Sequence, residues 1–296
     1  MVEQKMNKFP VGSKVIAFPG NQMQIVLTPK SLGKGQYGSV HLAYQKGDPS
    51  KVYAVKVIDR KRIKGQKPHD LLVNEIEIMT EIKDKNVVGL VTATKTLSNY
   101  YLVMEMCNGG DVDGFMKARG GYMSEPEARL ILKQLVKGLL AIRDKQVMHR
   151  DLKLPNILMN FPQLKIETFT QDTFNLKQYV KNLDIVGGKD SRGAVPFEVK
   201  IADLGFARKL EFESLATTRL GTPLVMAPEV LEGNKYDHSA DVWSLGCIFY
   251  EMLTGFSPFT GTSQTNLLEN IAKGDYKFPK TLKFSLQGLS FLNMCL

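Results

Sequence analysis

The sequence predicts an α+β fold of two lobes, in which a small strand-rich lobe with one helix precedes a larger, mainly helical lobe. Between residues 24 and 104 the apolar residues occur mainly in short β-branched and aromatic runs, which are typical of strands. After Asn108-Gly109-Gly110 the apolar residues change to helical spacing. The length of 296 residues allows one large domain or two smaller ones.

The expected domain covers residues 24–296. Residues 1–23 are interrupted by prolines and glycines, so we expect a loose leader there. The domain then divides into a small lobe at 24–104, a connection at 105–110 and a larger lobe at 111–296.

Five segments of the small lobe have the composition of strands. They are residues 25–27, 39–44, 52–58, 87–91 and 100–104. The turn at residues 46–50 contains Gly47 and Pro49, and it predicts a hairpin between the second and third strands. The pattern also predicts one helix, from about Pro68 to Lys83.

Three helices are expected in the larger lobe. The first runs from Pro126 to about Lys145, with Ser124 as its cap. The second runs from Asp241 to Leu253 and is apolar nearly all round, which is typical of a buried helix. The third is a late helix at residues 286–296.

An insert at about residues 161–198 interrupts the larger lobe. Its five positive and five negative charges balance, so it is not a charged tail. Leu176, Val180 and Leu183 have helical spacing. A solvated loop between two strands is nevertheless the favoured interpretation, and a docking element is the alternative.

The composition is that of an ordinary soluble globular protein, with 43% hydrophobic and 23% charged residues. No apolar run approaches the roughly 20 residues of a membrane-spanning helix. Three well-separated cysteines suit a reducing, cytoplasmic environment. The net charge of +9 favours anionic ligands, but a dispersed basic surface explains it better than nucleic-acid binding does.

The most informative segment is His149-Arg150-Asp151-Leu152-Lys153-Leu154-Pro155-Asn156. It supplies a carboxylate, a cation two residues later and an amide three residues beyond that. One tight loop therefore offers a proton acceptor, a phosphate neutraliser and a metal ligand, which are the groups that phosphoryl transfer requires.

This segment resembles the catalytic loop of protein kinases, in the version with Lys153 that is typical of the serine/threonine branch. The other kinase motifs follow in the correct order: Gly33–Val40, Val55-Lys56, Glu75, Asp203-Leu204-Gly205 and Ala227-Pro228-Glu229. The resemblance covers about residues 24–296. It implies a bilobal kinase fold and transfer of phosphate from ATP to protein substrates.

The resemblance assigns the catalytic roles. Asp151 accepts the proton of the substrate hydroxyl, and Lys153 neutralises the transferring γ-phosphate. Asn156 and Asp203 hold Mg²⁺, which prefers oxygen ligands. The alternative for both aspartates is simple loop capping, since Asp is common in turns.

Lys56 and Glu75 are expected to form a pair. Lys56 lies in a strongly apolar strand, and Glu75 lies on the apolar stripe of the expected helix. A buried carboxylate needs a cation, and the resemblance implies that the pair positions the α- and β-phosphates of ATP. Without the motifs, a surface Lys56 and a solvated Glu75 are the alternatives.

The remaining nucleotide contacts are implied by the resemblance. The glycine-rich run is followed by a strand rather than a helix, which favours a hairpin over phosphates and not a dinucleotide-binding motif. Val40, Ala54 and Leu158 are expected to sandwich adenine, behind the gatekeeper Met104. Asp111 lies where the family contacts ribose. Backbone contacts to ATP are expected at Gly33, Lys34, Gly35, Gly38, Glu105 and Cys107.

Regulation is expected in the activation segment, residues 203–229. In the family, the arginine that matches Arg150 commonly pairs with a phosphate on this segment. Thr218 matches the residue that usually accepts this phosphate, so an activating kinase or regulatory partner is expected to act there. Thr217 and Ser214 are lesser candidates, and Thr222 is expected to buttress Asp151 and Lys153.

Two further positions support the catalytic loop. Asp241 is expected to accept backbone amides and so anchor the loop, although an ordinary acidic cap of its helix is the alternative. Leu204 stands where the family usually has Phe, and this apolar replacement in the core is expected to be tolerated.

Residues 103–111 and 200–208 are most similar to the autophagy-related unc-51-like group, and calcium/calmodulin-dependent-like kinases are the alternative. In the family, a later arginine pairs with the glutamate that matches Glu229. This sequence has no such arginine, so we expect a C-terminally truncated kinase fold in which Glu229 is unpaired. Pro155 argues against an arginine-directed preference. A pseudokinase-like nucleotide-binding or scaffold module is therefore the alternative function, whereas a small-molecule or lipid kinase lacks support.

Overall fold

The protein was analysed as a computed structural model, which describes residues 9–20, 23–35, 38–63, 66–171, 173–181, 183–187, 197–209, 223–274, 276–279, 282 and 284–296. The chain divides into two compact units. The first unit comprises residues 1–80 and 88–107, and the second comprises residues 81–87 and 108–296. We describe each unit by itself.

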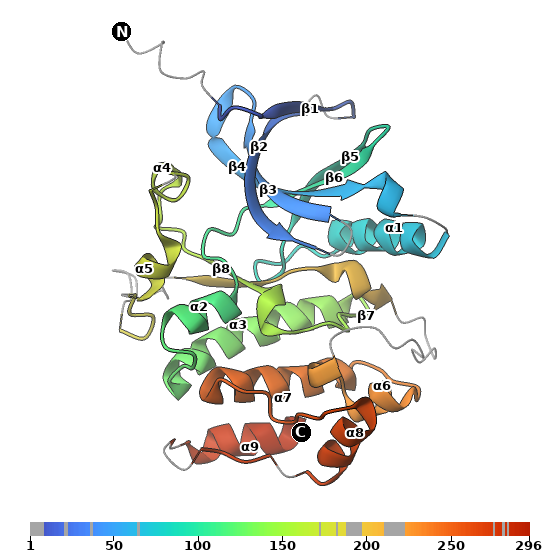
Figure 1. Ribbon diagram of the computed structural model, residues 1–296, viewed down its shortest axis with the longest axis vertical. Coiled ribbons are helices and arrows are strands. Elements are labelled where there is room, and N and C mark those ends of the chain that lie inside the picture. Colours follow the sequence, from blue (N-terminus) through green and yellow to red (C-terminus); the bar gives the residue numbers. More distant parts are fainter. Residues whose placement is uncertain are drawn as a thin grey trace. The chain divides into compact units, whose positions relative to one another are not determined.

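The described strands of the first unit form one six-stranded antiparallel sheet with the order β1-β2-β3-β4-β6-β5 (Figure 1). The strands are β1 Lys14–Phe18, β2 Met23–Lys34, β3 Gly38–Gln45, β4 Asp48–Asp59, β5 Leu90–Lys95 and β6 Asn99–Glu105. The predicted hairpin joins β3 to β4. A 3₁₀ turn, Arg60–Arg62, and helix α1, Gln66–Glu81, follow β4.

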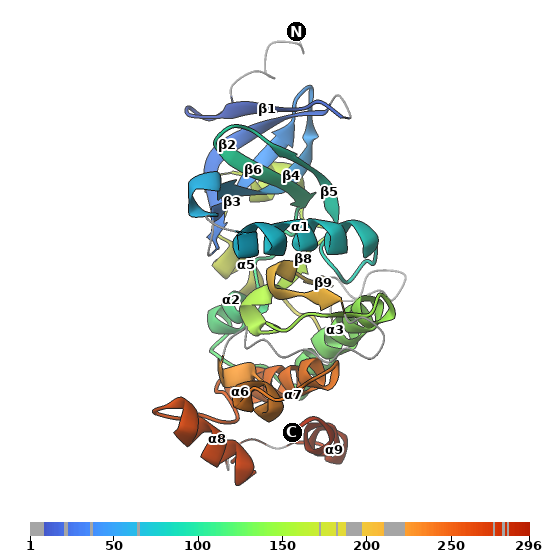
Figure 2. The ribbon, with the colours of Figure 1, turned by 90° about the vertical axis from the view of Figure 1, so that its right-hand side faces the viewer.

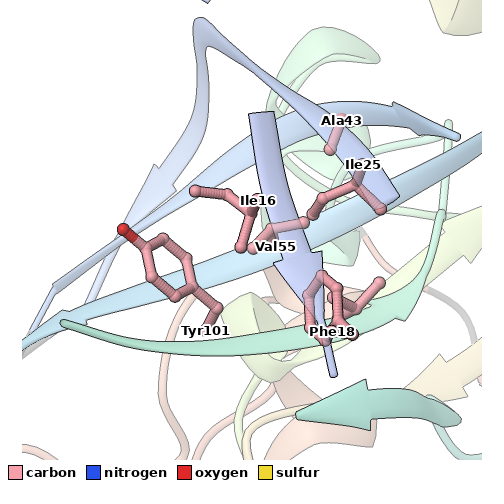
Figure 3. Packing of buried hydrophobic residues seen from close by; sticks show 7 residues of the cluster. Ile16, Phe18, Ile25, Ala43, Val55 and Tyr101 are labelled. Carbon is pink, nitrogen blue, oxygen red and sulfur yellow. The ribbon is translucent and has the colours of Figure 1, made fainter. Parts of the chain in front are cut away.

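The prediction of a loose leader over residues 1–23 is wrong for residues 14–18, which form β1. Ile16 pairs with Ile25, and Phe18 pairs with Met23. Ile16 and Phe18 lie in a buried cluster with Val55 and Tyr101 (Figure 3). Alternating side chains point to opposite faces of a strand, so burial of these two residues stabilises β1 despite the flanking prolines and glycines.

The strand predicted at residues 87–91 is shifted, because β5 begins at Leu90. Val87 instead forms an isolated parallel bridge with Ile201 and is buried in the second unit. The run at residues 87–91 is therefore divided between the two units, with Val87 in the second and the remaining residues in the first. Its composition gives no sign of this division.

The second unit is mainly helical (Figure 2). Its helices are α2 Val112–Ala118, α3 Glu125–Asp144, α4 Ile166–Phe169, α5 Leu176–Lys181, α6 Pro228–Glu232, α7 Ser239–Thr254, α8 Gln264–Ala272 and α9 Leu286–Cys295. Its strands form the antiparallel pairs β7 Val147–Met148 with β10 Arg208–Lys209, and β8 Ile157–Asn160 with β9 Glu198–Ile201. Short 3₁₀ turns occupy Leu154–Asn156, Leu204–Phe206 and Pro223–Val225.

The three helices predicted for this unit are confirmed as α3, α7 and α9. Ser124 and Glu127 form a capping box at the start of α3, which satisfies two backbone N–H groups that the helix leaves unpaired. Most residues of α7 are buried, as its apolar circumference predicts.

The insert lies between the strands β8 and β9, as predicted, but the prediction of a solvated loop is wrong for its two helices and its buried side chains. It contains α4 and α5, and the side chains of Phe169, Val180 and Ile185 are buried. Helix α5 packs against α2. The helical spacing of Leu176 and Val180 provides the apolar side that packs.

Among the described residues, the helices are all too short or too polar to cross a membrane.

Candidate active site

The loop at residues 149–156 is anchored by hydrogen bonds to Asp241 of α7. Asp241, which is 5% exposed, accepts hydrogen bonds from the backbone N–H groups of His149 at 2.9 Å and Arg150 at 3.0 Å. Arg150 has a φ of 66°, in the left-handed region that is unfavourable for a residue with a Cβ. The anchoring role predicted for Asp241 is confirmed, and its two bonds fix an unfavourable backbone conformation next to Asp151.

Asp151 lies at the centre of this loop and is 3% exposed. The ammonium of Lys153 lies 2.7 Å from its Oδ2. The Asn156 amide Nδ2 donates to the Asp151 backbone oxygen at 2.8 Å and to Oδ2 at 3.1 Å. The three groups predicted from the sequence are therefore together, and the carboxylate is held in one orientation by a cation and an amide.

The pairing of β8 with β9 places Asn156 and Asp203 at the same end of these two strands. Ile157 lies opposite Ile201, and Ala202 N–H donates to the Asn156 backbone oxygen at 2.9 Å. Asp203 follows directly, with an exposed side chain and a left-handed φ of 60°. Leu204 is buried, as predicted.

These two residues offer oxygen atoms that suit a hard cation. The bonds from Asn156 Nδ2 to Asp151 direct its Oδ1 away from that carboxylate. Among the described residues there is no cluster of three or more His, Cys, Asp or Glu side chains that holds a metal. One amide and one carboxylate fit Mg²⁺ because this ion takes few protein ligands and completes its shell with water and phosphate oxygens.

The pair predicted for the first unit is present. Lys56 Nζ donates to Glu75 Oε1 at 2.5 Å, and Glu75 is 5% exposed. Lys56 lies on β4 opposite Val40 and Leu102, and α1 carries Glu75 together with the buried Leu72 and Ile78. The pair thus links the sheet to α1 and neutralises a charge that burial alone makes costly.

The glycine-rich segment leads from β2 into β3, so it belongs to a hairpin and not to a dinucleotide-binding motif. Gly33 pairs with Val40, and Gly35 N–H donates to the Gly38 oxygen at 2.9 Å. A Cβ on Gly38 would lie 1.9 Å from the Val57 oxygen, so only glycine fits there. The hairpin includes Lys34, and its residues 36 and 37 lie outside the described part.

The other residues expected to contact adenine in the first unit lie on β3, β4 and the end of β6. Ala54 pairs with Met104, and Leu42 pairs with Ala54 on its other side. Glu105 N–H donates to the Gly89 oxygen at 3.0 Å, and the Glu105 side chain accepts from Gly89 N–H at 2.7 Å. Cys107 is the last residue of this unit and is partly buried.

Asp111 and Leu158 lie next to each other in the second unit through an isolated bridge. Asp111 Oδ1 also accepts from Gly114 N–H at 2.7 Å and so caps α2. The carboxylate expected to contact ribose therefore has a structural bond as well.

Several expectations from the activation segment lie outside the described residues, namely those on Ser214, Thr217, Thr218 and Thr222. Glu229 lies within the described part, and Ser239 Oγ lies 3.5 Å from its Oε1. This hydrogen bond is long and involves no arginine, so the expectation that Glu229 lacks the arginine partner of the family stays a prediction.

Two residues with structural roles, Asn108 and Arg119, were not predicted from the sequence. Asn108 accepts from Phe161 N–H at 2.7 Å and donates to the Phe161 oxygen at 3.0 Å. Arg119 donates to the oxygens of Val180 at 3.0 Å and Leu183 at 2.6 Å. The asparagine before two glycines is a turn signal that marks Asn108, whereas no local signal marks Arg119.

Comparison with known proteins gives one family and a consistent group of relatives. Residues 27–296 match the family described as "Protein kinase domain". "Serine/threonine-protein kinase ATG1c" of Arabidopsis thaliana is 34% identical over 88% of this chain and 31% of that protein. "Serine/threonine-protein kinase atg1" of Aspergillus oryzae is 33% identical over 90% of this chain and 30% of that protein.

A third relative, "Serine/threonine-protein kinase ATG1" of Saccharomyces cerevisiae, is 31% identical over 93% of this chain and 31% of that protein. The chain spans about a third of the length of these curated relatives. The expected similarity to the autophagy-related group is confirmed.

Proposed function

We propose that this chain, which belongs to the protein kinase domain family, transfers the γ-phosphate of ATP to serine and threonine hydroxyls of protein substrates. The observation that carries the proposal is the loop at residues 149–156, where a buried carboxylate, an ammonium and an amide lie within hydrogen-bonding distance. Phosphoryl transfer requires mainly positioning and charge stabilisation, and this loop supplies both.

In the proposed reaction, the oxygen of the substrate hydroxyl attacks the γ-phosphorus, Asp151 Oδ2 accepts the hydroxyl proton, and the bond from the γ-phosphorus to the bridging oxygen breaks to release ADP. Lys153 lies beside this carboxylate, and its ammonium stabilises the negative charge on the transferring phosphoryl group. Asn156 holds Asp151 in orientation through Nδ2, which keeps the accepting oxygen in place throughout the transfer.

Asn156 and Asp203 are the residues proposed to hold Mg²⁺. When bound, this ion neutralises phosphate oxygens and so lowers the repulsion between the nucleotide and the incoming hydroxyl. The oxygen donors and the fixed backbone at Ala202 support the assignment.

ATP is the proposed nucleotide ligand, and its proposed contacts follow from the residues assigned above. Lys56, held by Glu75, contacts the α- and β-phosphates. The glycine-rich hairpin supplies backbone amides to the phosphates, since no Cβ intervenes there. The other proposed contacts are Gly33, Lys34, Gly35, Gly38, Val40, Ala54, Glu105, Cys107, Asp111 and Leu158.

Protein substrates, a cytoplasmic location and activation by phosphorylation at Thr218 belong to the same proposal. Arg150 is the proposed partner of that phosphate, because an arginine forms short, charge-assisted hydrogen bonds with phosphate oxygens. If Thr218→Ala leaves the activity unchanged, this part of the proposal is wrong.

The proposal is tested with the full chain, γ-labelled ATP, Mg²⁺ and generic acceptor proteins. The wild-type chain is expected to label serine and threonine. Asp151→Asn is expected to reduce the rate by about 10²-fold or more while ATP binding persists. Asp144→Asn, a change at an exposed position at the end of α3, is the matched control and is expected to behave as wild type.

Equal labelling by the wild type and Asp151→Asn contradicts the catalytic assignment. If the wild-type chain binds ATP but transfers no phosphate, the pseudokinase-like module is the correct function instead.

A further inference from the structure

The insert contacts the segment that precedes α2. Leu176, the first residue of α5, places its Cδ2 3.3 Å from the position that a Cβ on Gly110 would take. Gly110 has a φ of +68°, a conformation that favours glycine. Helices α5 and α2 lie side by side in Figure 1 and are in contact. Leu176 therefore packs directly beside the residue before Asp111.

The other end of α2 is tied to the same insert. Arg119 follows α2, and its Nη1 donates to the oxygens of Val180 and Leu183 at 3.0 and 2.6 Å. Its Nη2 pairs with Glu127 of α3, and the guanidinium lies 5.1 Å from the Phe115 ring centroid. Arg119 thus links the last turn of α5 to α2 and α3, so the insert contacts the chain both before and after α2.

The insert also holds the residues just before α2. The amide of Asn108 exchanges two hydrogen bonds with the backbone of Phe161, the first residue of the insert. The Phe161 ring packs edge-on against Tyr179 of α5, with 5.5 Å between centroids. The segment 108–111 is therefore linked to α5 through Phe161 as well as through Leu176.

Helix α2 depends on such support because it has only seven residues. A helix of this length is unstable alone, so its position is set by packing and capping. Asp111 is its cap and accepts from Gly114 N–H. A shift of α2 therefore moves the Asp111 carboxylate.

We infer that α5 of the insert is a positioning element for Asp111 and, through it, sets the affinity of the enzyme for the ribose of ATP. Leu176 is the main positioning residue and Arg119 the second. The inference rests on the proposed function, since Asp111 meets ribose only if the chain binds ATP.

The test compares ATP with 2′,3′-dideoxy-ATP, which lacks both ribose hydroxyls, as phosphate donors for the full chain. Leu176→Ala is expected to raise the KM for ATP about fivefold, the net contribution of roughly one hydrogen bond. Neither kcat nor the KM for dideoxy-ATP is expected to change. Arg119→Met is expected to act in the same direction with a smaller effect, because it acts at the far end of α2.

A double-mutant cycle separates positioning from general loosening. In the Asp111→Ala background, Leu176→Ala is expected to have no further effect on the KM for ATP. Leu267→Ala is the matched control, since it truncates another leucine of this unit, in a cluster with Leu231 and Phe259. It is expected to lower the midpoint of thermal unfolding without changing the ratio of the two KM values.

The inference is overturned if Leu176→Ala raises both KM values equally or changes neither. If Leu176→Ala does not fold, the ratio of the KM for ATP to the KM for dideoxy-ATP is measured for Leu176→Val instead, and the same criterion applies. Absence of phosphate transfer by the wild-type chain overturns the proposed function as well. Normal transfer, with an effect of Asp111→Ala but none of the Leu176 variants, overturns only the role of the insert.

Discussion

Asp241→Asn tests how the catalytic loop is held in place. The two backbone N–H groups that Asp241 accepts belong to His149 and Arg150, immediately before Asp151. An asparagine retains one acceptor oxygen, so one of the two N–H groups faces an NH₂ group instead. The variant therefore removes one bond, weakens the other and leaves the shape of the side chain unchanged.

The cost follows from the burial of this site. Loss of the acceptor for a buried N–H costs about 1–3 kcal/mol, and replacing a charge-assisted bond by a neutral one costs about 1 kcal/mol. We therefore expect the free energy of unfolding to fall by about 2–4 kcal/mol. The backbone of Arg150 is also expected to leave its left-handed conformation in the variant, because this conformation costs roughly 1–2 kcal/mol for a residue with a Cβ.

The assay combines urea unfolding of the full chain with steady-state kinetics. The unfolding midpoint is expected to fall at constant m value, and kcat is expected to fall about tenfold or more, because Asp151 loses its fixed position. Asp113→Asn is the control: it weakens the pair with the exposed Lys117 and is expected to cost at most about 0.5 kcal/mol. A stability within about 0.5 kcal/mol of the wild type, together with an unchanged kcat, refutes this account of the loop.

Three further changes have definite expected results. Gly38→Ala introduces a Cβ 1.9 Å from a backbone oxygen of β4, so we expect a loss of about 1–3 kcal/mol in urea unfolding. Glu75→Gln removes the charge that faces the part-buried Lys56, and we expect a loss of about 2 kcal/mol and a higher KM for ATP in transfer assays. Hydrogen bonds from Ser239 hold the pKa of Asp237 below its usual value. The ionised carboxylate therefore stabilises the fold at pH values above its unfolded pKa, and this stabilisation is lost as the pH falls through its folded pKa. Because Asp237 is exposed and its charge is screened by solvent, Asp237→Ala is expected to be less stable than the wild type by at most about 1 kcal/mol at pH 7. In a pH series of unfolding curves the difference is expected to begin to shrink below about pH 4 and to be lost only as the pH falls through the lower, folded pKa.

Each of these has an outcome that contradicts it. A wild-type unfolding midpoint for Gly38→Ala means that β3 and β4 separate there without cost. An unchanged KM for ATP in Glu75→Gln means that Lys56 is positioned by other contacts. A stability difference for Asp237→Ala that stays undiminished as the pH falls through the folded pKa of Asp237 assigns the effect to lost packing rather than to the charge.

The fold was predictable where the pattern is long and the motifs are dense. The buried helix α7 follows from an apolar circumference over more than three turns, and Ser124 with Glu127 predicts the start of α3. The contact of Lys56 with Glu75 follows from two charges at apolar positions, since each needs the other. These features depend on local chemistry that the sequence displays directly.

The rest depends on tertiary contacts. β1 is short and lies between prolines and glycines, and it forms because Ile16 and Phe18 complete the core of the sheet. The seven residues of α2 are too few for a periodic signal. The packing of α5 on α2 depends on Arg119, which is about 60 residues away from Val180 in the sequence and carries no local sign of its partner. The reach of such side chains is visible only in the folded chain.

The most direct measurement is the single-turnover rate of phosphate transfer by the full chain, with saturating ATP and Mg²⁺, for the wild type and Asp151→Asn. If Asp151 accepts the hydroxyl proton, the variant binds ATP as the wild type does and transfers phosphate about 10²–10⁴-fold more slowly. Equal transfer rates at equal ATP occupancy contradict the assignment of Asp151 and, with it, the proposed mechanism.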